Sequence, residues 1–111
     1  MTVQELPGFA KEADRLLGER SHEQLIEFLG LNPKAGVIIR ETGGIRKLRW
    51  FGSGRGKRGG VRVIYYFHSE KLPLLALDIY GKNERENLTA SQKKQLRALV
   101  AQFIEAGLGE K

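Results

Sequence analysis

The chain has 111 residues, which is enough for one domain with a single hydrophobic core. Its composition, 41% hydrophobic and 29% charged with no cysteine, is typical of a soluble protein and excludes a disulfide framework and a thiolate site. The net charge of +6 favours an anionic partner, and the lack of an export signal or a long apolar run predicts a cytoplasmic protein that does not enter the membrane.

The first 31 residues predict two short helices. The first begins near Pro7 and carries apolar side chains at helical spacing, namely Phe9, Ala13, Leu16 and Leu17. Ser21 and Gln24 have the spacing of a capping box, and Gly30 is placed to end the second helix. The turn at Asn32-Pro33 then marks a change of periodicity.

The middle of the chain predicts a twisted antiparallel sheet of three to four strands, at residues 37–40, 45–51, 61–67 and 74–82, with a tight hairpin at 42–44. In the last strand, alternation places Leu75, Leu77 and Ile79 inward. On the opposite, exposed face we expect a set of cations and phenols from three strands: Lys47, Arg49, Arg62, Tyr66, Tyr80 and Lys82.

A helix follows the capping pattern of Thr89 and Gln92. Its predicted apolar stripe is Leu96, Leu99, Val100, Phe103 and Ile104. The predicted fold class is therefore α+β in a single domain spanning residues 1–111, with the helices covering one face of the sheet.

Positive charge is concentrated between Arg40 and Arg62. This segment holds eight cations against the single acid Glu41, a net charge of +7, so the rest of the chain is nearly balanced. Like charges repel one another, and the simplest reason to keep them together beside Trp50 and Phe51 is to bind a polyanion such as nucleic acid.

Three motifs, GGIRKLRW, GRGKRGGVRVIYYF and LDIYGKNERENLT, occur in this order before the last helix. With them, residues 33 to 104 resemble the RelE/HigB superfamily of bacterial toxins, and in particular the HigB-like branch of type II toxin–antitoxin systems. The resemblance implies the RelE-like fold, with two N-terminal helices, a curved antiparallel sheet with a basic concave face and a C-terminal helix.

The resemblance also implies an activity. Such toxins are mRNA interferases: ribosome-dependent endoribonucleases, and so hydrolases, that cut mRNA in the ribosomal A site and inhibit translation. The implied partners are the ribosome, mRNA and a cognate antitoxin, with no small-molecule cofactor. The only histidines, His22 and His68, have no carboxylate cluster at metal spacing beside them, so we expect a metal-independent reaction.

The catalytic arginine of the family corresponds to Arg62. Its strand lysine and arginine correspond to Lys47 and Arg49, or to Arg55 and Lys57 when counted back from Arg62. The late catalytic segment falls on Tyr80 to Asn83, where Tyr80 and Lys82 are the catalytic candidates. Here the sequence departs from the RelE pattern, because Asn83 replaces an arginine and Thr89 or a neighbour replaces the catalytic tyrosine. Further RNA contacts are expected from Arg46, Arg55, Arg58, Tyr66 and Asn83.

These residue types suit attack by the 2′-hydroxyl of RNA, which needs neither a metal nor a serine. The planar guanidinium groups of Arg62 and Arg49 match phosphate oxygens. Neighbouring cations disfavour the protonated form of a lysine, so Lys47, Lys57 or Lys82 is a candidate acid or base, with none preferred by the sequence. Tyr80 is a candidate for stacking or for proton donation.

A second function remains open at this point. A degenerate toxin would keep the basic sheet and bind RNA or DNA without cutting it. Single substitutions would abolish the activity of an enzyme, whereas only cumulative loss of charge would weaken a binding module.

Overall fold

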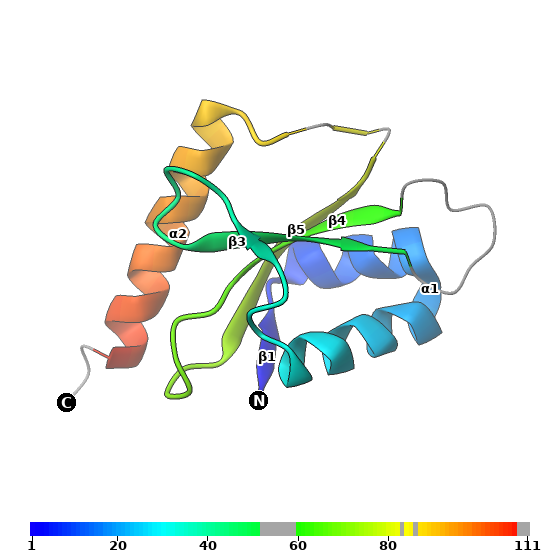
Figure 1. Ribbon diagram of the computed structural model, residues 1–111, viewed down its shortest axis with the longest axis horizontal. Coiled ribbons are helices and arrows are strands. Elements are labelled where there is room, and N and C mark those ends of the chain that lie inside the picture. The colour runs from blue at the N-terminus through cyan, green and yellow to red at the C-terminus, as the bar shows by residue number, and fades with distance from the viewer. Residues whose placement is uncertain (52–59, 83, 86, 109–111) are drawn as a thin grey trace.

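The computed structural model describes residues 1–51, 60–82, 84–85 and 87–108. Its elements in chain order are β1 (Val3–Glu5), α1 (Pro7–Leu31), β2 (Val37–Ile38), β3 (Ile45–Trp50), β4 (Val61–Tyr66), β5 (Leu74–Gly81) and α2 (Ala90–Leu108) (Figure 1). Four site predictions, Arg55, Lys57, Arg58 and Asn83, lie outside the described residues.

The strands form one mixed sheet in the order β1-β5-β4-β3-β2. β1 runs parallel to β5, and the other three pairs are antiparallel. β1 was not expected from the sequence, because three residues are too few to establish an alternating pattern. It is a strand only because the main chain of β5 pairs with it, as in the hydrogen bond from Leu74 N to Thr2 O (2.9 Å).

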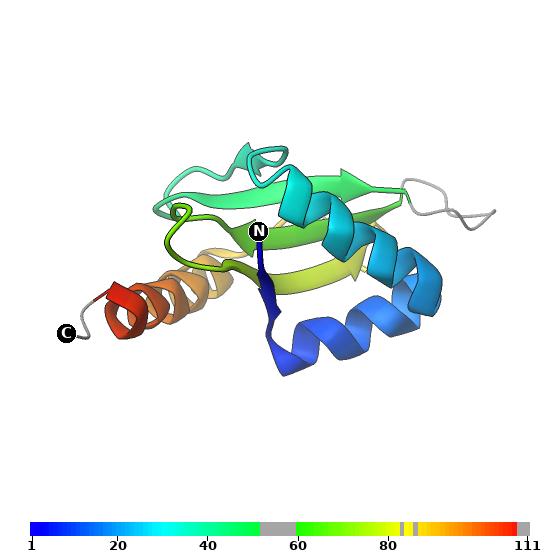
Figure 2. The same ribbon diagram turned by 90° about the horizontal axis from the view of Figure 1, so that it is seen from below.

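The two helices predicted at the N-terminus are the two halves of one element, α1. They are separated by a sharp kink at Gly18, whose φ of 82° and ψ of 164° are not helical (Figure 2). The predicted capping box is wrong, because the break lies three residues before Ser21. That side chain is buried, and its hydroxyl accepts a hydrogen bond from Trp50 Nε1 (3.4 Å).

The two helices cover opposite faces of the sheet, with α2 on the left and α1 on the right in Figure 1. α1 packs on a core that includes Val61, Val63 and Tyr65 from β4. α2 packs on Ile64 and Tyr66 of the same strand. The expected alternation along β4 is therefore confirmed, but the expectation that helices cover only one face is wrong.

The length of β2 and the register of β5 also differ from the sequence prediction. β2 contains only two residues, because the chain turns at 39–44, where the Thr42 hydroxyl donates to Ile39 O (2.7 Å) and accepts from Ile45 N (3.0 Å). An irregularity between Ile64 and Tyr65 shifts the register with β5. Leu75 and Leu77 consequently face α2, whereas Ile79, predicted on their side, joins the core under α1.

The start of α2 is as predicted. Thr89 N donates to Gln92 Oε1 (2.9 Å) and Gln92 N donates to Thr89 Oγ1 (3.1 Å), which is the reciprocal capping box. The predicted apolar stripe packs on the sheet with the exception of Leu99, which is exposed. Neither helix has a stretch long and apolar enough to cross a membrane within the described part of the chain.

Candidate functional site

Three predicted site residues form a row across the face of the sheet that α2 covers in part. Arg49 of β3 is the cross-strand partner of Arg62 in β4, and Arg62 is in turn the partner of Tyr80 in β5. Directly opposite residues share a face and lie side by side. Two cations in this relation repel each other, and an anion bound between them would remove that penalty.

Burial increases along the row. Arg49 is exposed, and its guanidinium carbon lies 5.9 Å from the centre of the Phe51 ring. Arg62 is only 9% exposed and Tyr80 only 1%. The row therefore leads from solvent at β3 to a buried phenol at β5.

A cleft of about 240 Å³ opens beside Tyr80. It is bounded by residues from five segments, the β2–β3 turn, β3, β5, the approach to α2 and α2 itself: Ile39, Lys47, Tyr80, Asn87, Leu88 and Lys93. Lys47 Nζ donates to Asn87 Oδ1 across the cleft, at 3.4 Å. The cleft thus combines two ammonium groups, an amide and a phenol between two apolar walls, a set that suits a phosphate attached to a nucleoside.

The Tyr80 hydroxyl makes no hydrogen bond with any described residue, although it is buried. A buried polar atom without a partner is unusual and costly. Burial raises the pKa of the Tyr80 phenol above its ordinary value, and the neighbouring Arg85 opposes this shift. The group is therefore protonated at neutral pH and can donate a hydrogen bond to a ligand in the cleft.

Arg85 holds the Tyr80 ring in place. Its guanidinium carbon lies 4.2 Å from the ring centre, and its NH2 group forms an ion pair with Asp78 Oδ2 at 2.8 Å. The turn that follows β5 is fixed as well, because Gly81 N donates to Glu84 Oε1 (2.9 Å) and Arg15 NH2 pairs with Glu84 Oε2 (2.7 Å). These two contacts hold the pKa of Glu84 below its ordinary value.

Of the predicted residues within the described part of the chain, Lys47, Arg49, Arg62 and Tyr80 are brought together. Tyr66 does not line the cleft, and it is not exposed as expected: it is buried in the core under α2, which raises its pKa. Arg46 lies on the opposite face, where its NH1 group donates to Gly36 O (2.8 Å). Lys82 is exposed just beyond the end of β5.

Three residues at this site were not predicted from the sequence: Arg85, Asn87 and Lys93. Lys93 had a detectable signal, because the capping box at Thr89 fixes the start of α2 and places Lys93 in its first turn, with Lys93 N donating to Thr89 O (2.9 Å). No acidic residue occupies that turn, although the helix dipole favours one there. Arg85 and Asn87 lie in an irregular segment that no periodicity describes.

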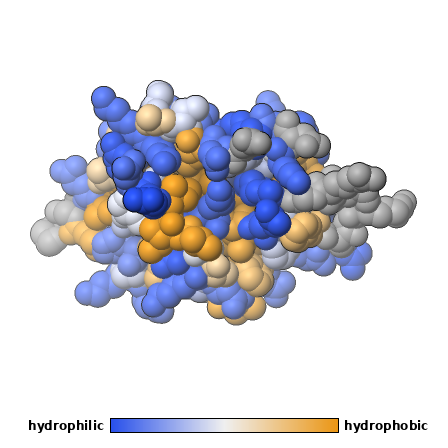
Figure 3. All heavy atoms as spheres, turned by 45° about the horizontal axis from the view of Figure 1, so that its top comes forward, coloured by the Kyte–Doolittle hydropathy of each residue, from blue (hydrophilic) through white to orange (hydrophobic). Residues whose placement is uncertain are grey.

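The surface around this side of the molecule is mixed in character. In Figure 3 an apolar patch occupies the middle of the visible face, with hydrophilic atoms on both sides of it. Among the described residues, no group of three or more His, Cys, Asp or Glu side chains is arranged to hold a metal ion. No model of a known protein family matches the chain.

Proposed function

We propose that this protein is the toxin of a type II toxin–antitoxin system, a ribosome-dependent mRNA endoribonuclease of the RelE/HigB type. The observation that carries the proposal is the buried hydroxyl of Tyr80, which has no partner among the described residues. Tyr80 lines a cleft together with Lys47 and Lys93 and is the neighbour of the Arg49–Arg62 pair. The resemblance of residues 33 to 104 to HigB-like toxins supports the same function. A cytoplasmic location, where ribosomes and mRNA are found, belongs to this proposal.

In the proposed reaction the RNA supplies its own nucleophile, the 2′-hydroxyl. Arg49 and Arg62 bind the oxygens of the scissile phosphate and stabilise the charge that develops on it. Tyr80 donates a hydrogen bond, and at the end of the reaction a proton, to the departing 5′-oxygen. Lys47 is the candidate acid or base that lines the cleft, whereas Lys82 lies beyond the strand and Lys57 outside the described residues.

Dependence on the ribosome follows from what this site lacks. A free ribonuclease needs a strong base beside the 2′-hydroxyl, and no histidine or unpaired carboxylate is among the residues that line the cleft. Positioning by ribosomal RNA would raise the effective concentration of the reacting groups. A cognate antitoxin would prevent this encounter by covering the cations of the site.

The test is primer extension on a defined mRNA with purified protein, with and without programmed ribosomes. We expect cuts at A-site codons only when ribosomes are present. Tyr80→Phe and Arg62→Ala should each lower the cleavage rate by about 100-fold or more, as expected for loss of a proton donor or of a phosphate contact. Tyr66→Phe is the matched control, because it removes the same atom from the neighbouring core and should keep full activity.

The alternative is a non-catalytic nucleic-acid-binding module, favoured by the departures from the RelE pattern at Asn83 and Thr89. In that case the parent would bind RNA but cut nothing in either reaction. Equal cleavage of free and ribosome-bound RNA would contradict both functions, since it would require a complete ribonuclease site.

A further inference from the structure

Among the described residues, the sheet ends in two edge strands, β1 on one side and β2 on the other (Figure 2). An edge strand presents main-chain N–H and C=O groups that can pair with another strand. Both edges of this sheet are short, and the side chains around them carry opposite charges.

The outward-facing groups of β1 belong to Val3 and Glu5. In the parallel ladder with β5, Leu74 N donates to Thr2 O (2.9 Å) and Leu6 N donates to Ala76 O (3.2 Å). The main-chain groups of the even-numbered residues of this segment therefore pair with β5, and the main-chain N–H and C=O groups of Val3 and Glu5 point away from it. The Val3 side chain packs on the core under α1, so this face of β1 is the α1 face.

Beside this edge lie two adjoining hollows of about 360 and 300 Å³, which share Ile26 and Glu27. Apolar side chains line much of them, including Leu31, which is 73% exposed. The first hollow is also lined by three carboxylates, Glu5, Glu23 and Glu27. Glu5 pairs with His22, whereas Glu23 and Glu27 are exposed and form no ion pair with a described residue.

At the other edge, Ile38 presents both its main chain and its side chain. Ile39 N donates to Ile45 O (2.8 Å), so the neighbouring N–H and C=O of Ile38 point away from β3. Val37 and Ile38 are 74% and 52% exposed. Ile38 is the cross-strand partner of Arg46 and shares its face of the sheet. Arg46 lies two residues from Leu48 in β3, so these two also share a face, and Leu48 packs on the core under α1. Ile38 therefore lies on the α1 face.

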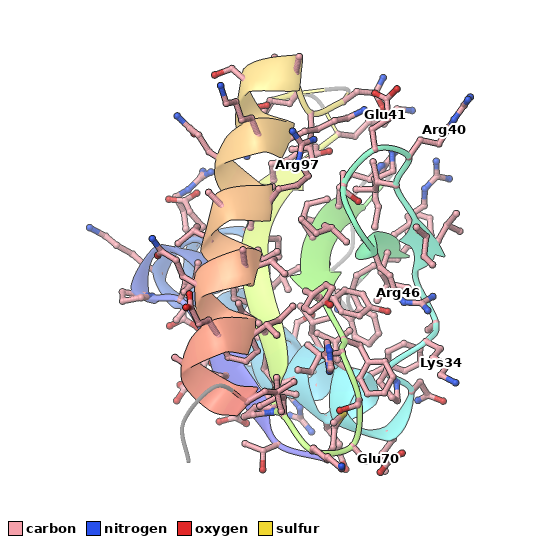
Figure 4. The ribbon with its side chains drawn as sticks, turned by 90° about the vertical axis from the view of Figure 1, so that its left-hand side faces the viewer. Lys34, Arg40, Glu41, Arg46, Glu70 and Arg97 are labelled. Carbon is pink, nitrogen blue, oxygen red and sulfur yellow. The ribbon has the colours of Figure 1, made fainter. Side chains whose placement is uncertain are left out.

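Cations surround the β2 edge. Figure 4 shows Lys34, Arg40 and Arg46 along this side of the molecule, with Glu41 at the turn. The edge is held rigidly, because Gly36 N donates to the Tyr65 hydroxyl (2.7 Å) and that hydroxyl donates to Pro33 O (2.9 Å). Arg46 NH1 donates to the carbonyls of Lys34 and Gly36, at 3.3 and 2.8 Å.

We propose that copies of this chain associate head to tail, with β2 of one copy pairing antiparallel with β1 of the next. β1 and β2 run in opposite directions in the sheet, so a second copy in the same orientation presents them antiparallel. Residues that lie directly opposite each other in an antiparallel pair share a face of the sheet. Ile38 can therefore lie opposite Val3 or Glu5, because all three are on the α1 face. Ile38 then enters the apolar hollow beside Ile26, and Lys34 and Arg40 meet Glu23 and Glu27.

The charges select this pairing over the other two. Two β2 edges would bring cations against cations, and two β1 edges would bring carboxylates against carboxylates, so both arrangements repel. Only the heterologous contact joins opposite charges, and such a contact extends a chain of copies without closing. The inference does not depend on the proposed function.

The test is sedimentation velocity of the full chain over a range of concentrations at low salt. Because few residues pair, we expect weak association, with a Kd of about 0.1 to 1 mM. The variant Glu23→Lys/Glu27→Lys has two basic edges, and Lys34→Glu/Arg40→Glu has two acidic edges. Each should weaken self-association by about 10-fold or more, and an equimolar mixture of the two should restore it.

The control is Glu19→Lys/Glu105→Lys, which changes the net charge as the first variant does but at exposed positions that line neither hollow, and it should associate like the parent. Ile38→Asp changes an exposed side chain and should also prevent association. A monomeric parent, variants that associate like the parent, or a mixture that stays monomeric would each overturn the proposal. If the parent is monomeric and an acidic strand-forming peptide instead shifts the Ile38 amide resonance, the edge serves another protein.

Discussion

Tyr65 and Tyr80 are both buried, but their hydroxyl groups have opposite hydrogen-bonding environments. The Tyr65 hydroxyl accepts from Gly36 N and donates to Pro33 O, at 2.7 and 2.9 Å. The Tyr80 hydroxyl makes no hydrogen bond with a described residue, and Tyr80 is one of the residues that line the cleft. The first group therefore stabilises the fold, whereas the second is available to a ligand.

This difference predicts different effects on stability. Tyr65→Phe leaves a buried N–H and a carbonyl without a partner, so it should lower the free energy of unfolding by about 1 to 3 kcal/mol. Tyr80→Phe removes an unsatisfied group, so it should change that free energy by less than about 0.5 kcal/mol or increase it. Urea denaturation monitored by circular dichroism measures both. A large loss of stability in Tyr80→Phe would mean that its hydroxyl already has a partner.

At the scale of elements, α1 depends on the kink at Gly18. A φ of 82° with a ψ of 164° is accessible to glycine and strained for other residues, although no atom would collide with an added Cβ. The kink turns the second half of α1 back along the sheet, so that Phe9 and Leu25 reach the same core.

Gly18→Ala should therefore lower the free energy of unfolding by about 1 to 3 kcal/mol, the usual cost of a strained main-chain conformation. Gly8→Ala is the control, because Gly8 is helical and has no atom within 4 Å of an added Cβ. That change should be neutral or stabilising by about 0.5 kcal/mol. Equal effects of the two substitutions in urea denaturation would contradict the role given to Gly18.

His22 links three segments of the chain. Its Nδ1 lies 2.7 Å from Asp14 Oδ1 in the first half of α1, and its Nε2 contacts Glu5 Oε2 in β1. Burial by itself would lower the pKa of His22, but the hydrogen bonds with Asp14 and Glu5 outweigh it and raise the pKa above the ordinary 6.5. The protonated imidazole of His22 therefore stabilises the packing of β1 against both halves of α1.

The pH dependence follows from this sign. Because the folded-state pKa is above the unfolded value, the stabilisation is fully present below about pH 6.5 and is lost as the pH rises through the folded-state pKa. We expect the free energy of unfolding in urea to fall over that upper range. His22→Gln should flatten the curve there, and an unchanged slope in this variant would assign the titration to another group.

At the scale of the whole molecule, charge is segregated. The cations of the candidate site lie on the sheet face toward α2, and the carboxylates beside β1 lie on the α1 side. A local excess of cations attracts nucleic acid largely by releasing counterions, which makes the affinity depend on salt.

Binding to a short single-stranded RNA should weaken linearly on a plot of log K against log salt. If each lysine in the cleft contacts a phosphate, as we propose, Lys47→Ala/Lys93→Ala should reduce the slope by about 1 to 2. Lys11→Ala/Lys71→Ala removes the same charge from exposed positions elsewhere and should keep the parent slope. Fluorescence anisotropy measures both. Equal slopes for the two variants would mean that the cleft does not receive a phosphate.

Much of this architecture could be predicted from local patterns. The alternation along β4 assigned Val63 and Ile64 to opposite faces, and the capping box assigned the start of α2, because both signals depend on neighbouring residues. The same alternation placed Lys47, Arg49 and Arg62 on one face, and the register in the structure adds that Arg62 lies directly opposite Arg49. The sequence by itself therefore determined which side chains of β3 and β4 share a face of the sheet.

What covers each face was decided only by the tertiary structure. An amphipathic stripe shows that α2 must pack on something, but not on which side of the sheet, so the burial of Tyr66 and Tyr80 was not predictable from it. The pairing of β1 with β5 and the approach of Asn87 and Lys93 to Lys47 join residues far apart in the chain. Contacts of that kind leave no periodic signal, because they depend on how completed elements pack together rather than on the residues beside them.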